Sequence, residues 1–192
     1  MPTYLLGAVD PVVSISLRVA LALLLATAAI EKLSAFGTFR HAAAGYGLLP
    51  RAWLTPIAVL LIAAEIVGGG LLLLPQLGPF GALPAASLFG IYTAAITMAL
   101  RRGQRGIDCG CAGPSGRLPL SPALAVRNGV LVGLTLVCAS PMAPRSWVWI
   151  DAFTVFASVT LLTFLYASAH VALANTTRMD RPLVHVELTE GA

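Results

Sequence analysis

The sequence predicts an all-α membrane protein, a polytopic bundle of about five transmembrane helices with a four-helix core and an added C-terminal helix. Of its 192 residues 58% are hydrophobic and only 10% are charged, whereas a soluble domain carries about 25% charged residues. Five apolar stretches approach the roughly 20 residues that a spanning helix needs. None of them alternates apolar and polar residues as a membrane β-barrel strand does. We expect one membrane domain over residues 1–174 and a polar tail over residues 175–192.

The five predicted spans are residues 13–36, 53–74, 80–100, 121–139 and 147–174. At 1.5 Å per residue, helices of these lengths match the hydrocarbon core of a bilayer. Pro56 lies in the first turn of the second span, and Ser121 and Pro122 supply an N-cap and a first-turn proline for the fourth. The fifth span is the longest, and we expect it to tilt or to extend beyond the bilayer.

The arginines in the loops predict an orientation. One side of the membrane would hold only Arg145, and the other would hold Arg40, Arg51, Arg101, Arg102, Arg105, Arg117, Arg178 and Arg181. The positive-inside rule places this second group in the cytoplasm and the N-terminus outside. The net charge of +4 is spread over several loops. No single basic face forms, which argues against a nucleic-acid partner.

Cys109 and Cys111 flank Gly110 in the long polar loop before the fourth span. They can be a redox pair, part of a metal site or two ordinary loop thiols. We favour the redox pair, because a disulfide between cysteines so close in sequence is strained and suited to exchange. Zinc wants four ligands, and no second cysteine pair accompanies this one, so we expect no metal site.

Two ionisable residues within the spans are further candidates. Glu65 lies 12 residues into the second span, where a charge costs about 2.5–3.5 kcal/mol on insertion scales. Arg127 lies about one turn into the fourth span and is expected to pair with Glu65 or Glu31. Such a pair serves either as a structural salt bridge or as a proton or quinone site. Glu31, beside Lys32, is expected to be an interfacial charge, and Cys138 to pack in the core.

Three groups of residues resemble a known family. They are Glu31-Lys32-Leu33 followed by Tyr46-Gly47-Leu48-Leu49-Pro50; Glu65 with Gly68-Gly69-Gly70; and Asp108-Cys109-Gly110-Cys111-Ala112-Gly113 followed by Arg127-Asn128. Together, over about residues 13–140, they resemble the methylamine-utilisation membrane protein family MauE and its DoxX-like relatives. Members of that family carry Phe where Ala112 stands, a difference that leaves the two thiols untouched.

The resemblance implies a multi-pass protein of the bacterial inner membrane that supports disulfide formation in the periplasmic methylamine dehydrogenase β-subunit. It implies a thioredoxin-like partner, MauD, with Cys109 and Cys111 as the exchanging thiols. The bundle is also similar in outline to vitamin K epoxide reductase-like oxidases, which implies quinone as a candidate electron acceptor. Alternatives are a non-catalytic scaffold for the same maturation machinery and a small-molecule transporter. The transporter is the weakest, because the sequence shows no inverted repeat.

The predicted orientation and the family resemblance disagree on the side of the membrane at which the two thiols lie. A periplasmic disulfide pathway requires them outside, whereas the loop arginines place residues 101–123 in the cytoplasm. Three explanations stay open. The thiols pass reducing equivalents outward, the loop re-enters the membrane, or the number of spans differs by one.

Overall fold

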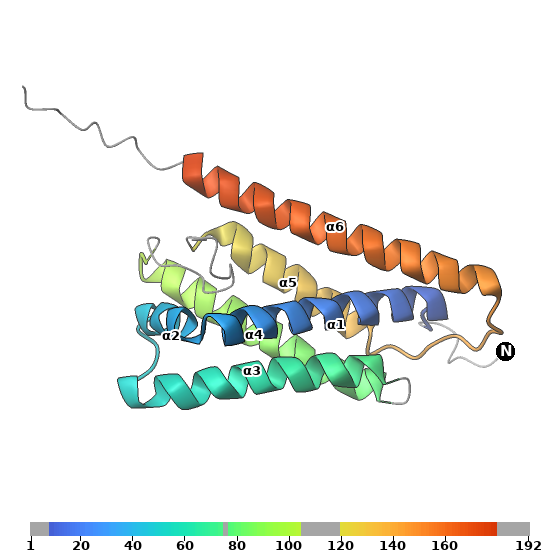
Figure 1. Cartoon of the computed structure of the whole chain (residues 1–192), viewed down its shortest axis with the longest axis horizontal. Helices are drawn as coiled ribbons and strands as arrows, with labels where there is room; N and C mark the ends of the chain where they lie inside the picture. The colour runs from blue at the N-terminus through green and yellow to red at the C-terminus, as the bar shows by residue number, and fades with distance from the viewer. Residues whose placement is uncertain (1–7, 75–76, 105–119, 180–192) are drawn as a thin grey trace, which may run out of the picture.

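A computed structural model describes residues 8–74, 77–104 and 120–179. The described residues form six helices: α1 (Pro11–Ser34), α2 (Phe36–Gly45), α3 (Arg51–Leu73), α4 (Gly78–Arg101), α5 (Pro122–Val137) and α6 (Trp149–Met179). The described part of the chain contains no named strand, and its one extended contact is an isolated bridge between Val9 and Met142. The predicted helical bundle is confirmed (Figure 1).

Four helices are long and apolar enough to cross a membrane: α1, α3, α4 from Phe80 onward, and α6 up to Asn175. The chain is therefore a multi-pass membrane protein. The fourth predicted span forms α5, which has only 16 residues. At 1.5 Å per residue it is about 24 Å long, less than the roughly 30 Å of a hydrocarbon core.

The sequence did not predict α2, a helix of 10 residues that begins where α1 ends. Ala35 interrupts the helical backbone between them. On α2, Phe39 is buried and packs against Ala29 of α1 and against Ala58 and Ile62 of α3. The short helix therefore covers one end of the α1–α3 contact.

The core joins α1, α3, α4 and α5 through apolar residues such as Leu25, Leu72, Phe89 and Leu131. Helices α3 and α4 approach so closely that a Cβ added to Gly81 would lie 2.7 Å from backbone atoms of Leu71 and Leu72. Glycine at this position permits backbone contact between helices inside lipid, where the hydrophobic effect does not draw helices together.

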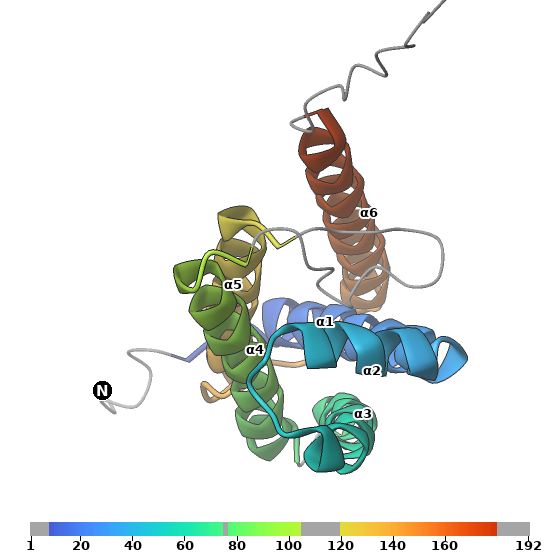
Figure 2. The same ribbon diagram turned by 90° about the vertical axis from the view of Figure 1, so that its left-hand side faces the viewer.

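Helix α6 lies outside this core. It runs along α1, on the side away from α3 (Figures 1 and 2). Phe153, Phe156 and Phe164 on α6 are 68%, 71% and 68% exposed. Aromatic side chains with this exposure on a spanning helix face the lipid. The C-terminal helix added to a four-helix core is thus present as expected.

Candidate functional site

The two ends of the bundle differ in charge. Arg40 on α2, Arg51 at the start of α3 and Arg101 at the end of α4 lie at one end, which we call the basic end. Asp10 and Arg145 mark the opposite end. The segment that carries Cys109 and Cys111 joins α4 to α5, and both of these helices meet it at the basic end (Figure 1). The two cysteines themselves lie outside the described residues.

Glu65 is the centre of a buried polar cluster near the middle of α3. Its side chain has no exposed surface. Lys32 of α1 donates from Nζ to Glu65 Oε1 over 2.5 Å, and the Tyr92 hydroxyl of α4 donates to the same oxygen over 2.6 Å. Three helices thus contribute one side chain each to the Lys32–Glu65–Tyr92 cluster.

Two aromatic rings enclose the Lys32 ammonium. Nζ lies 5.5 Å from the ring centroid of Phe39 and 5.2 Å from that of Tyr92. Both distances are within the range of cation–π attraction, which strengthens when the cation is removed from water. Lys32 is only 4% exposed. Phe39 belongs to α2, so the short helix provides one wall of the lysine site.

These contacts correct one expectation. The partner of Glu65 is Lys32, whereas Arg127 was expected. Lys32 is buried, while its neighbour Glu31 is exposed, as expected for an interfacial charge. Lys32 reaches Glu65 because α1 ends early. Glu65 lies 14 residues after the start of α3 at Arg51, so α3 continues about 21 Å toward the basic end beyond the level of Glu65.

The sequence held one sign of this pairing that our reasoning missed. Lys32 is the only lysine among 12 basic residues, and the other 11 are arginines. A compact ammonium on a flexible stem fits beneath two aromatic rings, whereas a planar guanidinium suits bidentate partners. The single lysine, at the end of the span before the one that holds Glu65, was therefore a better candidate than Arg127 for the partner of Glu65.

The second oxygen of Glu65 is available for a further contact. Oε2 is buried and accepts no hydrogen bond. Glu65 also lines a cavity of about 200 Å³ between α1 and α3, whose walls include the small residues Ala26, Ala29, Gly69 and Gly70. Lys32 and Tyr92 therefore occupy one oxygen of the carboxylate, and the other oxygen has no partner in the described part of the chain.

Arg127 lies in a separate cluster between α5 and α6. Its Nη1 is 3.2 Å from Nδ1 of His170, and its guanidinium carbon is 5.5 Å from the ring centroid of Tyr166. A guanidinium donates hydrogen bonds but accepts none, so Nδ1 is the acceptor and His170 is neutral. In the described residues no carboxylate pairs with Arg127. The expected pairing of Arg127 with Glu65 or Glu31 is wrong.

Cys138 lies in the core at the opposite end of the bundle, as expected for a packing residue. It is fully buried and unpaired. Its carbonyl oxygen accepts a hydrogen bond of 2.9 Å from Nη2 of Arg18, a buried arginine near the start of α1. Sequence reasoning did not select Arg18. The described residues contain no group of three His, Cys, Asp or Glu side chains placed to hold a metal ion.

A third charged cluster ties the loop before α6 to the N-terminal segment. Arg145 contacts Asp151 at 2.8 Å and Asp10 at 3.2 Å. The hydrogen bond from Arg145 to Asp151 raises the pKa of the arginine above its usual range. Asp151 also accepts a hydrogen bond from the Val148 amide, which caps the first turn of α6.

Comparison with known sequences places the chain in a family. The family model described as methylamine utilisation protein MauE matches residues 10–141. The chain belongs to the MauE family. Three of its relatives are each named methylamine utilization protein MauE. The protein of Methylophilus methylotrophus is 35% identical over 162 residues, which cover 83% of this chain and 85% of the relative.

The other two MauE relatives come from one genus. That of Paracoccus versutus is 34% identical over 161 residues, 83% of this chain and 87% of its own length. That of Paracoccus denitrificans is 35% identical over 133 residues, which cover 69% of this chain and 71% of the relative. No solved structure matches the chain significantly. The MauE match ends at residue 141, so it includes α1 to α5 and leaves out α6.

Proposed function

We propose that this MauE-family protein is a thiol–disulfide redox protein of the bacterial inner membrane that acts in methylamine utilisation. In this proposal it supports disulfide formation in the periplasmic methylamine dehydrogenase β-subunit, together with the thioredoxin-like protein MauD. Cys109 and Cys111 are the exchanging pair. The observation that carries the proposal is this Cys-Gly-Cys sequence in a chain that matches the MauE family over residues 10–141.

The architecture supports a thiol site at the membrane surface. The segment of residues 102–121 joins two helices at the basic end of the bundle. Cys138, the third cysteine, is buried at the other end of α5. Cys138 therefore serves as a control for Cys109 and Cys111, since it also carries a thiol but is inaccessible to a partner protein.

In the exchange we propose, Cys109 and Cys111 start as a disulfide. A thiolate of the reduced partner attacks one sulfur and forms a mixed disulfide. The partner's second thiolate then releases it, so the partner leaves oxidised and the pair has gained two electrons and two protons. A membrane quinone would accept these two electrons and two protons and become a quinol, and the Cys109–Cys111 disulfide would be restored.

Glu65 and Arg127 are not redox residues in this proposal. Glu65 already accepts hydrogen bonds from Lys32 and Tyr92, which supports a role in holding α1, α3 and α4 together. Arg127 lies in the other cluster, between α5 and α6. Neither residue is required to touch the exchanging sulfurs.

The test compares three serine variants in a host that depends on this protein for methylamine dehydrogenase maturation. We expect Cys109→Ser and Cys111→Ser to abolish disulfide formation in the β-subunit, measured by alkylation and gel shift, and Cys138→Ser to preserve it. Full maturation with both loop thiols removed would contradict the redox role. It would favour the scaffold alternative, in which the partner co-purifies equally well without them.

A second measurement determines the side of the membrane on which Cys109 and Cys111 lie. A membrane-impermeant maleimide is applied to intact and to permeabilised spheroplasts of a Cys138→Ser strain, before and after reduction. The loop arginines predict labelling only after permeabilisation. Labelling of intact spheroplasts would instead favour a loop that reaches the periplasmic side.

A further inference from the structure

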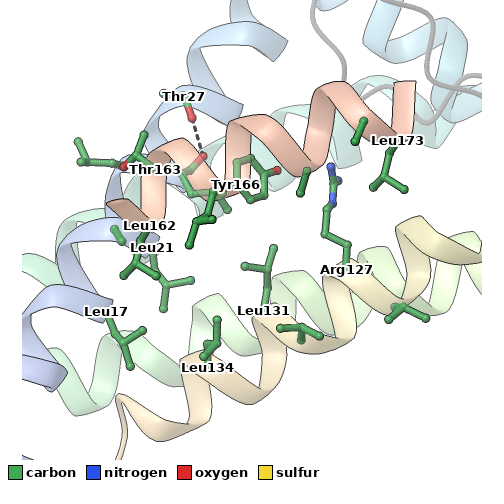
Figure 3. Close-up of a pocket in the computed structure, with 18 of the residues that line it drawn as sticks. Leu17, Leu21, Thr27, Arg127, Leu131, Leu134, Leu162, Thr163, Tyr166 and Leu173 are labelled. Carbon is green, nitrogen blue, oxygen red and sulfur yellow. Dashed lines mark hydrogen bonds between the residues drawn. The ribbon is translucent and has the colours of Figure 1, made fainter. Parts of the chain in front are cut away.

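A large apolar cavity lies between α1, α5 and α6. Its volume is about 660 Å³, within the range of small-molecule sites. Leucines dominate its walls, among them Leu21, Leu131, Leu134 and Leu162 (Figure 3). It exists because α6 packs along α1 while α5 packs mainly against α4. The cavity therefore has the apolar lining of a site for a hydrocarbon chain.

One end of this cavity is cationic. Arg127 reaches from α5 toward α6 at the end nearer the start of α5 (Figure 3). Its Nε is buried and makes no hydrogen bond. Its Nη1 faces neutral His170, and Tyr166 offers a ring face, so neither neighbour neutralises the charge. A half-buried guanidinium that pairs with no carboxylate of the described residues favours an anionic ligand with oxygen acceptors.

The depth of Arg127 points to a lipid headgroup. Arg127 is the sixth residue of α5, about 7.5 Å from the start of the helix. Because α5 is only about 24 Å long, it does not fill a roughly 30 Å hydrocarbon core, and the lipid beside it must thin or bend inward. Arg127 is thus within reach of phosphates at the basic end, where the loop arginines predict the cytoplasmic leaflet.

We propose that this cavity binds one anionic glycerophospholipid, with its phosphate on Arg127 and an acyl chain between α1, α5 and α6. This site goes beyond the proposed redox function and does not depend on it. Basic pockets between transmembrane helices on the cytoplasmic side bind acidic lipid headgroups in this way. A quinone fits the apolar walls, but its neutral carbonyls leave the charge of Arg127 uncompensated.

The experiment measures lipid retention by native mass spectrometry on the full-length protein, released from nanodiscs of phosphatidylcholine and phosphatidylglycerol in equal amounts. We expect the protein to retain phosphatidylglycerol preferentially. Arg127→Gln should lower that retention at least about tenfold, as expected for the loss of a charged hydrogen bond. Arg51→Gln is the matched control, because it removes the same charge from an exposed position at the same end.

A second pair of variants tests the apolar part of the site without changing charge. Ala169 on α6 lines the cavity and Ala167 does not, and both are exposed. Ala169→Phe should fill the cavity and reduce phosphatidylglycerol retention, and Ala167→Phe should leave it unchanged. This pair decides the question even if Arg127→Gln fails to fold.

Four outcomes would overturn the proposal. One is equal retention of both lipids by the wild-type protein. Another is undiminished phosphatidylglycerol retention in both Arg127→Gln and Ala169→Phe. The third is displacement of the lipid by an equimolar short-chain benzoquinone, which would make the cavity a quinone site. Inorganic phosphate at the same concentration should not compete, whereas competition by phosphate would show an anion site that needs no acyl chain.

Discussion

Lys32 and Arg127 are basic side chains within the helical bundle, and their surroundings are opposite. Lys32 is enclosed in the packed part of the bundle, ion-paired with Glu65 and covered by two aromatic rings. Arg127 borders a large cavity between loosely packed helices and has a neutral imidazole and a ring face as neighbours. A carboxylate of the protein itself neutralises the charge of Lys32, whereas the charge of Arg127 is available to a bound ligand.

The difference separates a structural charge from a binding charge. A buried pair joins helices, and removal of one partner leaves the other as an uncompensated charge. An unpaired guanidinium at the edge of a cavity adds little to folding but offers its full charge to a ligand. Substitutions in the two regions should therefore affect different measurements, stability in the first and ligand retention in the second.

The largest effect is expected for Glu65→Leu. The variant leaves the Lys32 ammonium buried without its carboxylate, a change that typically costs about 3–5 kcal/mol. The free energy of unfolding in mixed micelles should fall accordingly. The double variant Lys32→Met with Glu65→Leu removes both charges and should recover much of the loss. Equal destabilisation in single and double variants would show that the pair contributes only through packing.

Tyr92→Phe should have an intermediate effect. It deletes the hydroxyl that donates to Glu65 Oε1 over 2.6 Å but keeps the ring beside Lys32. Hydrogen bonds to charged groups contribute about 1.5–3 kcal/mol, and the same unfolding measurement should show a loss in that range. Thr97→Val on the same helix is the control, since its hydroxyl donates to the Thr93 carbonyl within α4 and not to a charged group.

Arg127→Met is expected to change the unfolding free energy by less than about 1 kcal/mol in lipid-free micelles. Its removal strands no buried carboxylate, and methionine adapts to an apolar cavity. Addition of phosphatidylglycerol should then stabilise the wild-type protein and not the variant. A large loss of stability without lipid would mean that Arg127 is itself structural, and would remove the contrast with Lys32.

The smallest effect is expected for Arg145→Gln at the opposite end of the bundle. Arg145 and Asp10 are exposed, whereas Asp151 is buried. Ion pairs with exposed members contribute little, and salt screens them. The wild-type and variant melting temperatures should converge as the salt concentration rises. A difference that persists at high salt would show that this cluster resembles the buried Lys32–Glu65 pair.

The sequence was sufficient to place five of the six described helices and to single out Glu65, and it was insufficient for α2 and for the partners of the charged residues. Apolar stretches of about 20 residues locate spans because a bilayer fixes their length, and an acid inside one is conspicuous because of its cost. Which helices touch depends on packing over the whole bundle. Arg127 was assigned to Glu65 on the basis of charge alone, while α5 packs mainly against α4 and turns Arg127 toward α6.

The sequence did not single out Lys32 for a related reason. Two residues from the end of α1, it occupies a position that in an isolated helix would reach the headgroups. Here α2 covers that end and Phe39 encloses the lysine. The cavity beside Arg127 was likewise beyond prediction, because it results from the gap between α5 and α6 and from no residue pattern.

The Lys32–Glu65 pair also bears on how the chain enters the membrane during synthesis. Helix α1 emerges from the ribosome first and carries a cation, and its anion follows 33 residues later on α3. Each of these two charges is costly in lipid alone, whereas the Lys32–Glu65 pair is neutral. We therefore expect α1 to remain beside the insertion channel until α3 arrives, so that the two helices leave it as a pair.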